Sequence, residues 1–95
     1  LDEAGFSKKF ARSPVRRAGY VRFLRNVLIA TGNSGDRALL PLVVKHLRHS
    51  DPLVRGMAVW ALSELAPISK LKAMAEDYIL GETDNLVAAE WAALL

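Results

Sequence analysis

The sequence predicts an all-α domain built as a superhelical stack of about two to three antiparallel helix pairs. Apolar residues recur at spacings of three and four along most of the chain, and no segment alternates with a period of two. The stretch Asp51-Pro52-Leu53-Val54 is echoed by Asp84-Asn85-Leu86-Val87, 33 positions later. A period of this length predicts repeated helical units, each of which buries its apolar side only by stacking on its neighbour.

The composition limits what such a domain can contain. Ninety-five residues make one small domain, of which 52% is apolar and only 7% aromatic. The chain has no cysteine, which excludes disulfides, thiolate metal sites and iron–sulfur ligands within it. The longest apolar runs, such as residues 39–44, are too short to cross a bilayer, and no signal-like opening precedes them. We therefore expect a soluble, cytoplasmic piece of a longer protein.

The chain is expected to begin with a basic lead-in and short helical turn over residues 1–19. The repeat domain is expected to follow over residues 20–95. Ser13-Pro14 is a helix start signal, and Gly19 is expected to break that first turn. A helix is predicted over residues 20–31. Gly32 would end it, and Asp36 would cap the next helix.

The second helix begins after Asp36, and Pro41 predicts either a late start or a bend. The strongest cap signal is Asp51 with Pro52 at the first helical position, and Ala66-Pro67 is expected to end the helix that follows. The residues predicted to be buried in these first three helices are Tyr20, Leu24, Val27, Leu28 and Thr31, then Leu39, Leu40, Val43, Val44 and Leu47, then Val54, Ala58, Ala61, Leu62 and Leu65.

The last part of the chain is predicted to hold two more helices. One runs from about Ser69 to Leu80, and the other begins at Leu86 after a capped turn over residues 81–85. In the first of the two, the residues predicted to be buried are Leu71, Met74, Ala75, Tyr78 and Ile79.

Positive charge is concentrated near the start of the chain. Residues 12–26 contain five arginines, and no acidic residue interrupts positions 8–26. Residues 1–49 hold ten Lys/Arg against three acids, whereas residues 50–95 hold three against seven. Uneven halves of this kind favour a basic face that meets a polyanion.

Residues 51–62, DPLVRGMAVWAL, fit the HEAT repeat pattern of Asp, Val-Arg, Ala and Ala-Leu, which indicates a fold rather than a function. Residues 13–36 and 51–65 also resemble the C-terminal HEAT-like domain (a PBS-lyase-type repeat) of epoxyqueuosine reductase. The matching elements are Arg16-Arg17, Phe23-Leu24-Arg25-Asn26, Gly32-Asn33 and the helix from Pro52 to Trp60.

The resemblance implies a parent enzyme of transfer-RNA queuosine biosynthesis. In that family a catalytic core with two 4Fe-4S clusters and cobalamin precedes this domain and performs the reduction. The implied partners are tRNA, through its anticodon stem-loop, and the upstream catalytic domain of the same chain. No membrane partner is implied, and no catalytic, cofactor-binding or metal-binding residue is predicted within these 95 residues.

Arginine and lysine are the residues that neutralise nucleic-acid phosphates, and the arginine fork suits phosphate oxygens. Arg55 has an alternative, structural interpretation, because the Arg of this repeat pattern often pairs with a neighbouring turn. Tyr20 and Phe23 are interpreted as core residues, with base stacking as the alternative. The predicted nucleic-acid contacts are Arg16, Arg17, Arg22, Arg25, Lys45, Arg48 and Arg55.

A second hypothesis stays open for the whole domain. The basic strip would then serve a structural or protein–protein interaction module, docking on the missing domain or on an acidic partner. His46 and His49 lie three apart, as two metal ligands would, but neither a cysteine nor a carboxylate accompanies them. No metal site is therefore predicted.

Overall fold

The computed structural model describes the backbone of residues 14–95 and the side chains of residues 18–95. Within this range the protein is all α, with five α-helices, one 3₁₀ helix and no strand. The all-α prediction is confirmed. The elements are α2 (Pro14–Asn33), η1 (Arg37–Leu39), α3 (Leu40–His46), α4 (Pro52–Leu65), α5 (Ile68–Ile79) and α6 (Asn85–Ala92).

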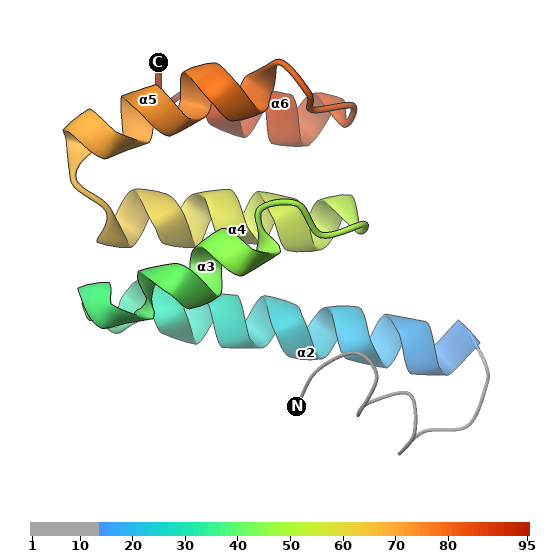
Figure 1. The fold of residues 1–95 in the computed structure, drawn as a ribbon. Coiled ribbons are helices and arrows are strands. Elements are labelled where there is room, and N and C mark those ends of the chain that lie inside the picture. The colour runs from blue at the N-terminus through green and yellow to red at the C-terminus, as the bar shows by residue number, and fades with distance from the viewer. Residues whose placement is uncertain (1–13) are drawn as a thin grey trace.

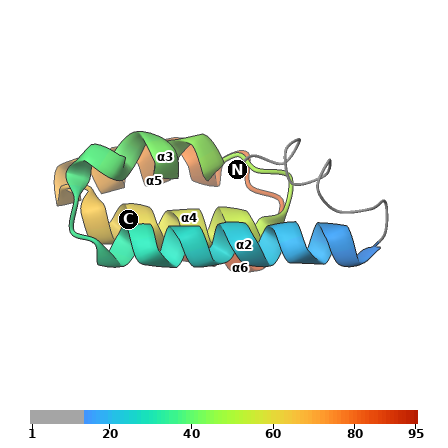
Figure 2. The ribbon, with the colours of Figure 1, turned by 90° about the horizontal axis from the view of Figure 1, so that it is seen from below.

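The helices form two layers. One layer holds α2, α4 and α6, and the other holds α3 and α5 (Figure 2). Helix α4 lies at the centre and packs against α2, α3, α5 and α6. In Figure 1 the chain rises from α2 through α4 to α6, so residues 14–95 form two helix pairs, α2/α3 and α4/α5, and one further helix.

Aspartate caps start three of the helical segments, as the sequence predicts. The Asp36 carboxylate accepts a hydrogen bond from the Ala38 amide at the start of η1. Asp51 Oδ1 accepts from the Leu53 amide, and Asp84 caps α6 in the same way. Each cap satisfies an amide that the first helical turn leaves without a partner. Pro41 lies in the first turn of α3, which corresponds to the expected late start.

Two predicted interruptions of the first helix are wrong. Helix α2 continues through Gly19, so the expected boundary between residues 19 and 20 lies inside one helix. It also continues past Gly32 to Asn33, and the left-handed residue of the following turn is Gly35, with φ of 68°. A glycine inside a helix costs only about 1 kcal/mol, which the packing of neighbouring side chains offsets.

The core runs through the middle of the stack and contains most of the predicted residues. Val44 is a correction, because it is 41% exposed, and His46 is buried in its place on α3. Val43, His46 and Leu47 lie three and four residues apart and share the buried side of α3, which leaves Val44 toward the solvent. The buried apolar residues are Tyr20, Val21, Leu24, Leu28, Val43, Leu47, Val54, Ala58, Val59, Ala61, Leu62, Leu65, Ala66, Leu71, Ala75, Val87 and Trp91.

Gly32 is required where α2 meets α4. A Cβ added at Gly32 would lie 2.9 Å from Cη2 of the Trp60 ring, which is too close for ordinary contact. We expect Gly32→Ala to lower the free energy of unfolding by about 1–2 kcal/mol, because the indole has to move. The matched control is Gly56→Ala, whose Cβ would lie 3.8 Å from Cγ2 of Val87. That variant should gain up to about 1 kcal/mol from helix propensity. Urea unfolding of both variants checks the prediction, and equal effects would contradict it.

Candidate nucleic-acid interface

Arg22 and Arg25 lie on the solvent face of α2. Both side chains are exposed, while Val21, Leu24 and Leu28 on the other side of the helix are buried. Residues three apart are neighbours on a helix surface. Within residues 18–95 no hydrogen bond or ion pair joins either guanidinium to another group. The two cations therefore form an exposed pair that can contact successive anionic groups.

The surroundings of this pair contain no neutralising charge on the same helix. Helix α2 has no Asp or Glu along its 20 residues. In the repeat register that aligns Leu24 with Val54, Arg25 corresponds to Arg55, 30 positions later. These two equivalent arginines nevertheless have very different environments.

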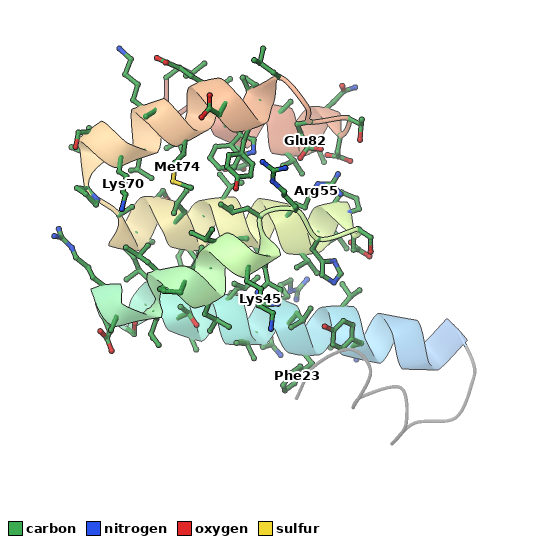
Figure 3. The ribbon with its side chains drawn as sticks, viewed as in Figure 1. Phe23, Lys45, Arg55, Lys70, Met74 and Glu82 are labelled. Atoms are coloured by element: carbon green, nitrogen blue, oxygen red, sulfur yellow. The ribbon has the colours of Figure 1, made fainter. Side chains whose placement is uncertain are left out.

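Arg55 is fixed by four hydrogen bonds. Its Nε donates to Oε1 of Glu82 at 2.9 Å, and its Nη2 donates to Oε2 at 2.8 Å. Its Nη1 donates to the carbonyl oxygens of His49 at 2.9 Å and Ser50 at 3.1 Å. The hydrogen bond to Glu82 raises the pKa of Arg55 above its ordinary value, although burial opposes the shift. Figure 3 shows the pair between α4 and the turn that precedes α6.

The structural interpretation of Arg55 is therefore confirmed, since it ties two neighbouring turns together. Its side chain is only 15% exposed, and that of Glu82 is 5% exposed. A guanidinium held by a bidentate carboxylate has little capacity left for a phosphate. We accordingly leave Arg55 out of the candidate surface.

The turn before α4 explains why Arg25 lacks such a partner. In the turn before α6, Oε2 of Glu82 accepts a hydrogen bond from the Asp84 amide. In the turn before α4, Nδ1 of His49 accepts the corresponding bond from the Asp51 amide. His49 thus occupies the place of Glu82, and the first turn offers no carboxylate at the position where Arg55 finds one.

The two basic residues of α3 and its following turn lie in the other layer of the stack. Lys45 is exposed near the end of α3 (Figure 3). Arg48 is also exposed, and its guanidinium carbon lies 4.9 Å from the centre of the Tyr78 ring. Tyr78 in turn stacks on Trp91 at 5.1 Å. The structure therefore divides these four cations between α2 and the α3 segment, and it does not gather them on one helix face.

Two further predicted contacts, Arg16 and Arg17, lie in the first turns of α2. Their side chains fall outside the described residues, as does the whole lead-in over residues 1–13.

The aromatic residues among these cations are largely structural. Tyr20 is 5% exposed, and its ring lies 6.1 Å from that of His49, which excludes base stacking in this conformation. Phe23 is half-buried against the core and projects from the side of α2 that faces away from α4 (Figure 3). Of the two, only Phe23 keeps part of its side chain exposed.

The side chains of both histidines form hydrogen bonds with main-chain atoms. Nδ1 of His46 lies 2.9 Å from the Leu42 carbonyl oxygen, and the centres of the two imidazole rings lie 6.2 Å apart in a stacked arrangement.

Residues 18–95 contain no group of three or more His, Cys, Asp or Glu side chains able to hold a metal ion. No helix in the described part of the chain is long and apolar enough to cross a membrane.

Comparison with protein families identifies the fold. The family model described as HEAT repeats matches residues 15–95. The chain belongs to the HEAT repeat family. The layered helix pairs and the capped turns before α4 and α6 are thus the repeat units of a HEAT domain.

Two curated relatives confirm the second resemblance. An epoxyqueuosine reductase of Xanthomonas campestris pv. campestris is 38% identical over 64 residues, which cover 66% of this chain and 18% of the relative. An epoxyqueuosine reductase of Alicycliphilus denitrificans is 34% identical over 71 residues, covering 66% of this chain and 20% of the relative. The matched part of the chain therefore covers about a fifth of the length of these relatives. No solved structure matches it.

Proposed function

We propose that this HEAT domain belongs to an epoxyqueuosine reductase and holds the anticodon stem-loop of tRNA during queuosine modification. Two supports are independent of each other. The similarity to two epoxyqueuosine reductases points to the reaction. The surface chemistry of α2 points to the kind of contact that this part of the enzyme makes.

The observation that carries the RNA contact is the exposed pair Arg22 and Arg25 on a helix without acidic residues. Phosphate neutralisation by Lys and Arg dominates nucleic-acid affinity. An arginine that no carboxylate holds loses no existing ion pair when it binds a phosphate. Such contacts fix register and orientation without reading sequence, which suits a positioning domain.

Lys45 and Arg48 would extend this contact from the α3 layer. The ring of Tyr78 supports the Arg48 guanidinium, which reduces the side-chain freedom lost on binding. Arg16 and Arg17 would lengthen the basic stretch along α2 toward its first residue, Pro14. In this proposal the α2 pair makes the principal contacts and the other four cations are secondary.

The reduction itself would take place outside this HEAT domain. Iron–sulfur clusters are held by cysteine thiolates, and the chain has no cysteine, so its residues do not fit that group. The domain would act by positioning: it restrains the stem-loop so that the modified nucleoside reaches a reaction centre in another part of the enzyme.

We expect binding of an anticodon stem-loop to depend steeply on salt. Four neutralised phosphates would give a slope of roughly −3 to −4 in a plot of log affinity against log salt concentration. Replacing Arg22 and Arg25 together by Ala should make this slope shallower by roughly 1.4–1.8 and weaken binding. Fluorescence anisotropy with a labelled stem-loop at several salt concentrations measures both quantities.

The charge-matched control replaces Lys70 and Lys72 by Ala. Both are exposed cations on α5, and α4 lies between α5 and α2 in Figure 1. This control should bind the stem-loop with the affinity and salt slope of the unmodified protein. Equal losses in the two double variants would show a non-specific response to net charge and would overturn the assignment to α2.

A further inference from the structure

An apolar groove with a volume of about 330 Å³ lies along the contact between α4 and α6. Leu53, Met57 and Trp60 of α4 line one side, and Leu86 of α6 lines the other. The two helices begin at the same end of the stack, so the groove runs between parallel neighbours (Figure 1). It lies away from α3 and α5, and none of the cations discussed above lines it.

The two walls carry equivalent exposed leucines. Leu53 is 61% exposed and Leu86 is 79% exposed, and they occupy the same position in successive repeats, 33 residues apart. Single exposed apolar side chains are common on protein surfaces. Two that line the same apolar groove enlarge its apolar surface, and such contiguous surfaces are typical of interaction sites.

The rim of the groove is negative. Among the side chains of residues 18–95, Asp84 and Glu90 are the only ionisable ones that line it, and no Lys or Arg does. Glu64 follows Trp60 by one helical turn and is also exposed. The only cation on either helix is Arg55, which is paired with Glu82. This surface therefore repels a nucleic acid and attracts an apolar ligand that carries positive charge.

We infer that the groove binds a basic amphipathic helix of a partner protein. Apolar side chains spaced along one face of that helix would enter the groove between Leu53 and Leu86. Lysines or arginines on its flanks would face Asp84 and Glu90, as in other complexes in which a helix lies in a groove. This inference does not depend on the proposed function, because it uses different helices and the opposite charge.

The test uses the whole chain and a designed probe. The probe is a labelled helical peptide with leucines at spacings of three and four and lysines on both flanks. Replacing Leu53 and Leu86 together by Asn should weaken peptide binding at least about tenfold, measured by fluorescence anisotropy. Both positions are exposed, so we expect the double variant to fold, which circular dichroism verifies.

Two controls make the outcome decisive. Ile68→Asn with Leu80→Asn removes apolar side chains that are 84% and 87% exposed elsewhere on the domain, and it should leave peptide binding unchanged. A peptide with Glu in place of every Lys should not bind. Equal binding of the two peptides, or of the two double variants, would overturn the inference. So would displacement of the peptide by an anticodon stem-loop, or a dimer of the unmodified chain that the Leu53/Leu86 variant abolishes.

Discussion

Replacing Arg55 by Met is expected to lower the free energy of unfolding by about 3 kcal/mol. The substitution leaves the Glu82 carboxylate, 5% exposed, without the guanidinium that binds both of its oxygens. It also removes two hydrogen bonds to the carbonyl oxygens of residues 49 and 50. One side chain thus joins α4 to the turn that precedes it and to the turn that precedes α6. Its loss should therefore destabilise the packing of both repeats.

The same pair makes stability depend on pH. Burial alone would raise the pKa of Glu82, but the hydrogen bonds from Arg55 and from the amides of Asp84 and Thr83 outweigh it and hold the pKa below its ordinary value. A carboxyl whose pKa is lower in the folded state stabilises the fold above its unfolded pKa. This contribution is lost as the pH falls through the folded-state value. The pair should therefore stabilise the domain at pH 7 and cease to do so in strong acid.

Urea unfolding of the unmodified protein and of Glu82→Gln, measured from pH 7 down into strong acid, shows how much Glu82 contributes to the free energy of unfolding at each pH. The difference between the two should be constant near neutral pH and should shrink below about pH 4.5. Glu76→Gln is the matched control, because Glu76 is exposed on α5. A difference between Glu82→Gln and the unmodified protein that persists unchanged in strong acid would show that Glu82 acts through packing rather than through its charge.

Trp91→Ala is the second substitution with a large expected effect, about 3–5 kcal/mol. Trp91 is only 1% exposed and is among the largest fully buried side chains of the described residues. It stacks on Tyr78, on whose ring the Arg48 guanidinium lies. Truncation would leave a cavity between α5 and α6 and would remove the support of that ring. The total stability of a domain of this size is about 5–15 kcal/mol, so a large fraction of it would be lost.

The control for this prediction is Trp91→Phe, which keeps an aromatic ring against Tyr78. We expect it to retain more than half of the stability that Trp91→Ala loses, as measured by urea or thermal unfolding. If Trp91→Ala and Trp91→Phe were equally stable, the stacking on Tyr78 would contribute nothing measurable and α6 would not depend on this anchor.

The sequence predicted the helices well because their signals are local. Asp51 with Pro52, and Asp84 before α6, start helices where expected, since a cap acts on amides two or three residues away. Gly19 and Gly32 were misread as stops for the same reason. Their local propensity favours a break, whereas the continuous buried face of α2 keeps the helix intact.

The candidate site could be predicted only in part. Helical spacing placed Arg22 and Arg25 together on one face of α2, and the repeat pattern anticipated that Arg55 would contact a neighbouring turn. The partner Glu82, 27 residues away, carried one signal in the sequence: the echo of His49-Ser50-Asp51 in Glu82-Thr83-Asp84. When the two segments are aligned, the turn before α4 has a histidine at the position where the turn before α6 has a carboxylate.

By itself, the sequence determined the helical repeat, its capped turns and the excess of positive charge near its start. A cap depends on neighbours within one helical turn, and the repeat and the charge excess follow directly from the order of the residues. Only the tertiary structure decided which arginine is held by a carboxylate and which is exposed. It alone placed Gly32 beneath Trp60 and joined Leu53 and Leu86 across one groove. These pairings depend on how successive repeats stack, which brings together residues that no local pattern connects.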